Sequence, residues 1–299
     1  MNVTALAYVV LDSPTPGKWR TFLQETVGLA AASIAGDGDF YRMDDAAWRI
    51  QVRQGEAERF AAAGIALFDN AALEACVARL RAGGHLCAED PALAKARNVE
   101  RLVRTADPCG NPIELVVGRP LGYEHFISPA GVSGFVADDM GLGHVVLPAP
   151  DVEAAKAFWI EVIGLHLTDT MSFTLSEETG PQKLYFMHAD NARHHSVALF
   201  EAPSSVGLIH LMLEARTIDD VGRFIDRCAQ HGVHLASQLG RHSNDRMLSV
   251  YVVSPGGSML EFGCDGLQID RRTWVPTTSL VPDLWGHKFM GGPPDIPAI

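Results

Sequence analysis

The stretch GLGHVVLPAPD at residues 141–151 has a close counterpart near the start of the chain, ALAYVVLDSPT at residues 5–15. Shifting the sequence by 136 residues, from 8 to 144, superimposes the two stretches without a gap. Tyr8 of the first copy then falls on His144 of the second. A long internal repeat of this kind predicts two homologous halves that share one fold.

Each half divides further into two similar modules. LEACVARLRAGGHL at residues 73–86 resembles VGRFIDRCAQHGVHL at residues 221–235, and both have the apolar spacing of a helix. Short apolar runs typical of strands flank these segments, so that a strand, a helix and several strands follow one another four times. We expect an α+β fold of two homologous domains, each made of two βαβββ modules that form a curved open barrel. The domains are expected at residues 1–130 and 131–299.

Capping residues and local composition predict the bounds of one helix and two irregular segments. Asp151 precedes a segment of helical period and is a candidate N-cap, and Gly164 is expected to end that helix. We interpret residues 168–182 as a loop, and the Gly- and Pro-rich tail at residues 291–299 as loosely ordered.

The composition limits the choice of partners. The chain has 299 residues and a formal net charge of −12, which argues against nucleic acid or an anionic membrane as the main partner. It has neither a signal-peptide pattern nor an apolar run of about 18 residues. Its five cysteines are odd in number and form no CxxC motif, which favours a reducing compartment. We expect a cytoplasmic protein that binds a small molecule.

His144, His210 and Glu261 are candidate metal ligands. Both histidines open the first strand of their modules, so a pseudo-twofold axis within the half would bring them to one centre. Two imidazoles and one carboxylate are the set that non-haem Fe(II) oxygenases use, with the remaining positions open, and Mn(II) or Zn(II) would also suit them. A single histidine in a strand is more often an ordinary core or surface residue; the repeat is what favours ligation here.

The first half lacks this set. It keeps Glu114 at the position of Glu261, but it has Tyr8 and the histidine-free stretch AAGIAL at residues 62–67 around the two histidine positions. One carboxylate without imidazoles is a poor site for such an ion. We therefore expect metal in the second half alone.

A second group of polar side chains follows the candidate ligands. NARHHSVALF at residues 191–200 contains His195, and GRHSNDRMLSVY at residues 240–251 contains His242, Asn244, Asp245 and Tyr251. These residue types suit acid–base catalysis and hydrogen bonding to a substrate. An ordinary polar turn is the competing interpretation of HSNDR.

These stretches, together with FYRMDDAAWRIQVRQGE at residues 40–56 and LWGHK at residues 284–288, resemble the type I extradiol catechol dioxygenases of the vicinal oxygen chelate superfamily. The resemblance covers nearly the whole chain and is strongest to the 2,3-dihydroxybiphenyl 1,2-dioxygenases. It implies a homo-oligomeric enzyme of aromatic catabolism that uses Fe(II), or Mn(II), and O2 to cleave a catechol beside its diol. The implied substrate is a bicyclic or aryl-substituted catechol.

The resemblance also implies roles for individual residues. His144, His210 and Glu261 match the iron ligands. His195 matches an acid–base histidine that faces the O2 position, whereas His194 is expected to point away from it. His242 and Tyr251 match residues that hydrogen-bond the catechol oxygens. Asn244 and Asp245 match the polar pair beside them. The residues that match the lining of the ring pocket are Val146, Phe186, Ala198 and Pro282. For His287, in LWGHK, a structural role is expected rather than a catalytic one.

Two other functions remain open. Glyoxalase-like isomerases and metal-dependent thiol transferases share this superfamily, but they usually have more carboxylate ligands, and the set His195, His242 and Tyr251 argues against them. Binding proteins without catalysis also occur in the superfamily, but those lack the metal-binding triad that this sequence retains.

Overall fold

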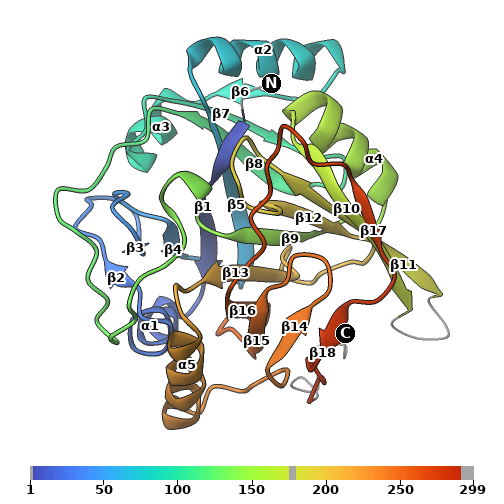
Figure 1. Cartoon of the computed structure of the whole chain (residues 1–299). Coiled ribbons are helices and arrows are strands. Elements are labelled where there is room, and N and C mark those ends of the chain that lie inside the picture. Colours follow the sequence, from blue (N-terminus) through green and yellow to red (C-terminus); the bar gives the residue numbers. More distant parts are fainter. Residues whose placement is uncertain (1–2, 175–179, 291–299) are drawn as a thin grey trace.

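Two curved β-sheets lie side by side in the molecule, one from each half of the chain (Figure 1). The structure is a computed structural model that describes residues 3–174 and 180–290. No helix within these ranges is long and apolar enough to cross a membrane.

The first half forms an eight-stranded sheet in the order β2-β3-β4-β1-β5-β8-β7-β6. Its first module contains β1 (Val3–Ser13), α1 (Pro16–Thr21), η1 (Phe22–Val27), β2 (Ala30–Ala31), β3 (Asp39–Arg42) and β4 (Ile50–Gln54). Its second module contains β5 (Arg59–Leu67), α2 (Asn70–Ala82), β6 (Ala88–Glu89), α3 (Pro91–Arg97), β7 (Arg101–Ala106) and β8 (Pro112–Val117).

The second half forms a ten-stranded sheet in the order β17-β10-β11-β12-β9-β13-β16-β15-β14-β18. After the short helix η2 (Asp138–Met140), its first module contains β9 (His144–Pro148), α4 (Val152–Ala157), η3 (Phe158–Ile163), β10 (His166–Thr174), β11 (Pro181–His188) and β12 (Val197–Phe200). Its second module contains β13 (His210–Glu214), α5 (Ile218–His231), β14 (Gly240–His242), β15 (Leu248–Val253) and β16 (Met259–Cys264), and β17 (Thr277–Ser279) and β18 (Asp283–Trp285) follow. The expected fold of two βαβββ modules per half is confirmed. The expected boundary near residue 130 falls between the two sheets and stays a prediction.

The repeat extends to the ends of the helices. Asp151 accepts a hydrogen bond from the backbone N–H of Ala154 and so caps α4, as predicted. Gly28 and Gly164 occupy equivalent positions after η1 and η3, with φ of 91° and 104°. These left-handed conformations favour glycine, which explains why both copies keep it.

Side chains alternate between two environments along the central strands. Val145 and Leu147 of β9 belong to a core that contains residues of both halves, whereas His144 and Val146 face the concave side of the second sheet. The concave side is therefore where a second-half site can form.

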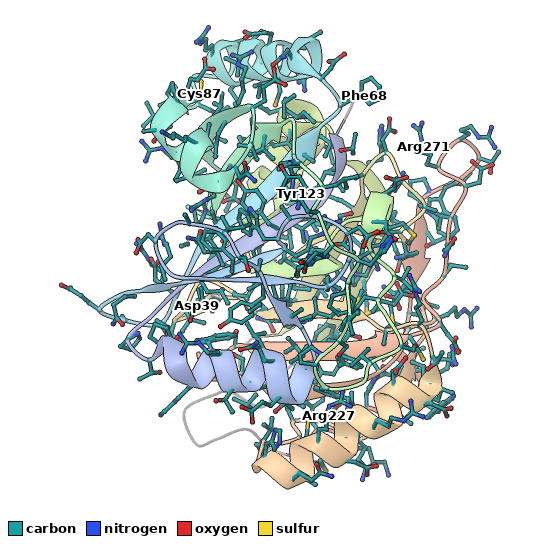
Figure 2. All side chains as sticks on the ribbon, turned by 90° about the vertical axis from the view of Figure 1, so that its left-hand side faces the viewer. Asp39, Phe68, Cys87, Tyr123, Arg227 and Arg271 are labelled. Carbon is teal, nitrogen blue, oxygen red and sulfur yellow. The ribbon has the colours of Figure 1, made fainter. Side chains whose placement is uncertain are left out.

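The two halves contact each other reciprocally. Arg79 of α2 donates through Nε to the carbonyl oxygen of Val162 in η3, at 2.7 Å. Arg227 of α5 donates in the same way to the carbonyl oxygen of Thr26 in η1, also at 2.7 Å. Figure 2 shows α5, with Arg227, beside the first helix of the chain. Each guanidinium satisfies a carbonyl group at a helix end of the other half.

Two segments differ from the sequence-based expectations. Most of residues 168–182 is strand and not loop, because β10 and β11 pair from His166 opposite His188 to Thr174 opposite Pro181. Residues 277–290, which we call the C-terminal strap, contain two strands that were not predicted. β17 pairs with β10 and β18 pairs with β14, so the strap joins the two edges of the second sheet (Figure 1). The tail at residues 291–299 lies outside the described residues.

Candidate active site

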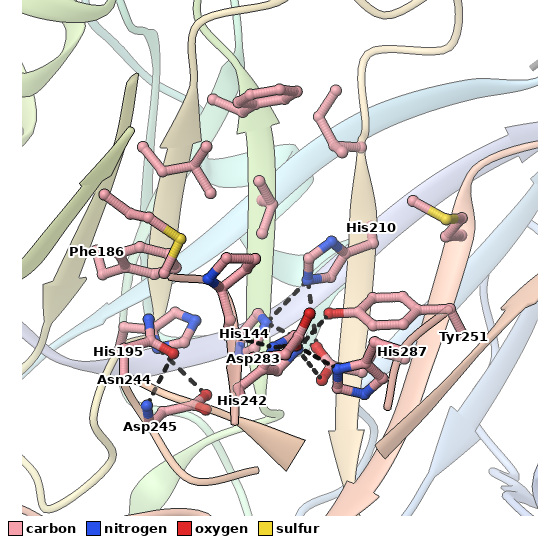
Figure 3. Close-up of a pocket in the computed structure, with 18 of the residues that line it drawn as sticks. His144, Phe186, His195, His210, His242, Asn244, Asp245, Tyr251, Asp283 and His287 are labelled. Atoms are coloured by element: carbon pink, nitrogen blue, oxygen red, sulfur yellow. Dashed lines mark hydrogen bonds and ion pairs between the residues drawn. The ribbon is translucent and has the colours of Figure 1, made fainter. Parts of the chain in front are cut away.

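The concave face of the second sheet encloses a cavity of about 260 Å³ (Figure 3). Every candidate ligand and catalytic residue predicted from the sequence lines it: His144, His195, His210, His242, Asn244, Asp245, Tyr251 and Glu261. Residues from two separate modules and from the strap thus meet in one place.

Strand register explains why the three candidate ligands converge. Met212 of β13 lies opposite His144 in β9 and opposite Glu261 in β16. His210 precedes Met212 by two positions and therefore points to the same face of the sheet. The Nε2 atoms of His144 and His210 lie 3.0 Å apart, and each lies 3.4 Å from Oε2 of Glu261.

These distances fit a metal ion. An ion bound at about 2.2 Å to three ligand atoms at right angles would hold those atoms about 3.1 Å apart, as on one face of an octahedron. Two imidazoles and a carboxylate on one such face form the arrangement of non-haem Fe(II) oxygenases, with the opposite face open. His144, His210 and Glu261 can therefore hold a divalent ion at the base of the cavity.

The surroundings of His144 and Glu261 favour the protonation states that a metal requires. Burial lowers the pKa of His144 to about 4, against the opposing effect of Glu261, so the imidazole is neutral. Burial alone would raise the pKa of Glu261, but hydrogen bonds with His144, His210 and His242 outweigh it and hold this pKa well below its usual value. A neutral imidazole beside an ionised carboxylate is a competent ligand pair.

His195 lies on one side of His144, and Tyr251 lies on the other (Figure 3). The rings of His195 and His144 are 4.0 Å apart between centroids. Burial, followed by His144, lowers the pKa of His195 well below its usual value, so this imidazole is neutral at rest. His194 packs its ring edge-on against Trp274 and does not line the cavity, as expected for its alternate position.

Asn244 and Asp245 form a turn beside His195. The backbone N–H of Asp245 donates to Oδ1 of Asn244 at 2.8 Å, and Oδ2 of Asp245 lies 3.9 Å from Nδ1 of His195. The HSNDR stretch is thus a polar turn and part of the cavity wall at the same time.

His242 and Tyr251 form the opposite wall. Nε2 of His242 lies 2.8 Å from the hydroxyl of Tyr251 and 3.3 Å from Oε1 of Glu261. Burial, followed by Glu261, raises the pKa of Tyr251 well above its usual value, so its hydroxyl stays protonated. Burial disfavours a charged His242, but hydrogen bonds with Asp283 and Glu261 outweigh it and raise the pKa of His242 well above its usual value.

The apolar wall agrees with prediction in part. Val146, Phe186 and Pro282 line the cavity, but Ala198 does not. Ala198 lies opposite both Val146 and Phe186 in the sheet, and its short methyl side chain is fully buried in the cluster that they form.

Sequence reasoning missed several cavity residues. Met171 and Phe173 lie in β10, within the segment expected to be a loop. Leu184 lies in β11 two positions before Phe186, so the period-two alternation of a strand would have placed it on the same face. The strap residues carried no strand signal strong enough to place them. The missed residues are Met171, Phe173, Leu184, Phe200, Ile209, Met259, Asp283 and Phe289, and His287 was assigned a structural role only.

The first half presents a different set at the equivalent positions. β1 and β5 place Val10 opposite Ala62, just as β9 and β13 place Val146 opposite His210. Ala62 therefore replaces His210, as Tyr8 replaces His144. With two of three ligands missing, the first half does not hold the donor set.

Comparison with known proteins agrees with this geometry. Residues 141–262 match the family model of the glyoxalase/bleomycin resistance protein/dioxygenase superfamily, and residues 6–55 match that of dihydroxybiphenyl dioxygenase BphC D1. The biphenyl-2,3-diol 1,2-dioxygenase of Metapseudomonas furukawaii is 38% identical to this chain over 291 residues, which cover 96% of this chain and 94% of that protein. The chain belongs to the extradiol dioxygenase family.

Other relatives support the same family. The iron-dependent extradiol dioxygenase of Rhodococcus jostii (strain RHA1) is 35% identical over 299 residues, 98% of this chain and 99% of that protein. The crystal structure of BphC, a halotolerant catechol dioxygenase, superimposes with a TM-score of 0.90 at 34% identity, covering 99% of this chain and 97% of the other. The family and the fold expected from the sequence are thereby confirmed.

Proposed function

We propose that this extradiol dioxygenase uses Fe(II) to open the ring of an aryl-substituted catechol beside its diol, adding both atoms of O2. One observation carries the proposal. The imidazole nitrogens of His144 and His210 and the carboxylate of Glu261 converge within 3.4 Å of one another at the base of a cavity that has acid–base groups on both sides. O2 is the oxidant, so the reaction requires no further reductant.

His144, His210 and Glu261 would hold the ion at the base of the cavity. When bound there, Fe(II) would supply a centre that holds a catechol and O2 side by side and exchanges electrons with both. The iron-dependent extradiol dioxygenase of Rhodococcus jostii supports this choice of metal. Mn(II) suits the same donor atoms and is the alternative ion.

The polar residues on the two sides of His144 would have different roles. The Tyr251 hydroxyl and the His242 imidazole lie beside Glu261, where they would donate hydrogen bonds to the oxygens of a catechol and stabilise its ionised form. His195 lies on the far side of His144 and is neutral and buried, so it would pass a proton between the substrate and O2-derived atoms during the reaction.

The shape of the cavity supports a substrate with a second ring. Its far wall is made of apolar side chains, among them Met171, Phe173, Leu184 and Phe200. A cavity of about 150 Å³ holds one benzene molecule, so the observed 260 Å³ has room for more than one ring. A relative that acts on biphenyl-2,3-diol supports the same class of substrate.

A direct assay tests the proposal. The purified chain is loaded anaerobically with Fe(II) and mixed with 2,3-dihydroxybiphenyl, 3-methylcatechol or catechol, and O2 is then admitted. We expect uptake of one O2 per molecule of catechol and a yellow ring-fission product, fastest with the biphenyl compound. Parallel loading with Mn(II) tests the alternative ion. Absence of O2 uptake with every catechol would contradict the proposal and favour an isomerase, a thiol transferase or a binding protein of the same superfamily.

A further inference from the structure

Asp283, in the C-terminal strap, contacts two histidines of the cavity at once. Its Oδ1 lies 2.8 Å from Nδ1 of His242 and 2.6 Å from Nδ1 of His287 (Figure 3). A carboxylate between two imidazole Nδ1 atoms accepts hydrogen bonds from both, which sets the orientation of each ring. Asp283 therefore determines where the remaining Nε2 atoms of both histidines point.

The Nε2 atoms of both histidines are linked to the carboxylate of Glu261, directly from His242 and through Ser249 from His287. Nε2 of His242 lies 3.3 Å from Oε1 of Glu261. Nε2 of His287 lies 3.1 Å from the hydroxyl of Ser249, and that hydroxyl donates to the same Oε1 at 2.6 Å. Nε2 of His287 also lies 3.0 Å from the carbonyl oxygen of Ser249. Asp283, His242, Glu261, Ser249 and His287 thus form a closed ring of hydrogen bonds.

The backbone of the strap is shaped to bring His287 into this ring. His287 is 4% exposed and adopts a left-handed conformation with φ of 47°, which is uncommon for a residue with a side chain. Gly286 before it has φ of 80° and lies against β14, where an added Cβ would come within 2.3 Å of the carbonyl oxygen of Leu239. Gly240 makes the matching approach, because a Cβ there would come within 2.3 Å of the backbone nitrogen of His287. Such strain persists where the surrounding structure holds it in place.

We propose that Asp283 is a positioning residue for the ring-cleavage reaction. It holds the imidazole of His242 with Nε2 toward the hydroxyl of Tyr251, at 2.8 Å, and toward the carboxylate of Glu261. Through His287 and Ser249 it also fixes the carboxylate of Glu261. The strap is therefore part of the active site, and His287 has a role in the site beyond packing. This inference rests on the proposed function for its kinetic consequence, but the ring itself does not.

The ring is tested first without metal or substrate. In metal-free protein with 15N-labelled histidine, the Nδ1–H groups of His242 and His287 are expected to give two low-field proton resonances, because each is bonded to a carboxylate. In Asp283→Asn both resonances are expected to move upfield or disappear. Leu284→Ala is the matched control, because Leu284 is the next residue of the strap, is 49% exposed and does not line the cavity. This variant is expected to keep both resonances. Unchanged resonances in Asp283→Asn would overturn the proposal.

Kinetics then test positioning in the iron-loaded enzyme. Asp283→Asn is expected to keep its iron and its melting temperature but to lose about 10- to 100-fold in kcat/KM for the catechol, the usual cost of removing a group that orients a ligand or catalytic histidine. In a His242→Ala background the same change is expected to cost less, about 3-fold, because the contact with His242 is already lost and only the route through His287 and Ser249 remains. Equal losses in both backgrounds would overturn the proposal, and so would a loss that follows iron content.

His287→Gln gives a second route if Asp283→Asn folds poorly. This change removes the hydrogen bond between His287 and Asp283. The His242 resonance is therefore expected to remain while the His287 resonance disappears. Loss of neither resonance would contradict the ring. If the unmodified enzyme cleaves no catechol, the proposed function fails, whereas the resonances still decide whether Asp283 holds the two histidines.

Discussion

The hydroxyl of Tyr8 donates a hydrogen bond of 2.6 Å to Oε2 of Glu114, at the place where the second half brings His144 next to Glu261. Arg97 donates to both oxygens of the same carboxylate, each at 2.8 Å. Burial, followed by Glu114, raises the pKa of Tyr8 well above its usual value, so its hydroxyl remains a donor. A guanidinium thus supplies the positive charge that a metal ion would supply in the other half.

Helix α3 is what brings Arg97 there. It is inserted between β6 and β7, whereas the corresponding connection between β14 and β15 is a short turn that carries Asn244 and Asp245. The ring of Trp48 lies 4.3 Å from that of Tyr8 and belongs to the apolar cluster around it. The first concave face is therefore filled where the second is hollow.

Removing Arg97 is expected to destabilise the protein strongly. Arg97 and Glu114 are both nearly inaccessible to solvent, with side-chain exposures of 3% and 6%. Arg97→Met leaves a buried carboxylate without its partner, which typically costs about 3–5 kcal/mol. Urea unfolding followed by circular dichroism measures the change in the free energy of unfolding.

Two comparisons control this experiment. Arg20→Met removes an exposed ion pair with Asp39 and is expected to cost less than about 1 kcal/mol. Adding Glu114→Gln to Arg97→Met removes the uncompensated charge and is expected to restore most of the lost stability. A double variant as unstable as Arg97→Met would show that the charge of Glu114 is not the cause.

His210→Ala is expected to lose its iron. The change removes one of three proposed ligands and leaves only His144 and Glu261 to hold the ion. Inductively coupled plasma analysis of the desalted protein measures iron per chain. His125→Ala is the control, because that side chain is 93% exposed and lies between β8 and η2, outside the cavity. Stoichiometric iron in His210→Ala would show that the ligand assignment is wrong.

His195→Ala is expected to bind iron and catechol but to turn over slowly. His195 contacts His144 without being one of the three converging donors, so the metal site should survive. Loss of an acid–base group typically lowers kcat by about 10²-fold or more. Anaerobic titration with a catechol measures binding, and O2 uptake measures kcat. Turnover near that of the unmodified enzyme would exclude the acid–base role. His166→Ala is the control, because it replaces an exposed histidine and should leave kcat unchanged.

Leu184→Phe is expected to narrow the choice of substrate. Leu184 lines the cavity in the cluster that includes Phe200 and Met171, away from the proposed ligands. A larger side chain there competes with the second ring of a bicyclic substrate. The ratio of kcat/KM for 2,3-dihydroxybiphenyl to that for catechol should fall about 10-fold or more, since small changes in an apolar pocket are worth this much.

The neighbouring residue provides the control for that prediction. Tyr185 follows Leu184 in β11, and its side chain points to the opposite face of the sheet, where its hydroxyl donates to Glu153 at 2.6 Å. Tyr185→Phe should leave the substrate ratio unchanged. A fall in the ratio in both variants would point to general distortion of β11 rather than to crowding of the cavity.

The sequence by itself determined the repeat, and with it most of the architecture. Matching stretches around Tyr8 and His144 revealed the two halves, and period-two alternation placed His144 and Val146 on one face of a strand. Asp151 and Gly164 marked the ends of a helix because capping is a local property of the chain. The family resemblance then selected candidate residues, all but one of which the structure brings into one cavity.

Only the tertiary structure decided how the two concave faces differ. Arg97 contacts Glu114 because the inserted helix α3 packs against the concave face of the first sheet. Asp283 contacts His242 because the strap connects the β10 edge of the second sheet to its β14 edge. The same holds for Ala198, whose position on the correct face did not expose it to the cavity. Periodicity in the sequence predicts which face of a sheet a side chain occupies. Whether that face is covered by other segments or left as a cavity depends on contacts between residues far apart in the sequence, and no local pattern encodes those contacts.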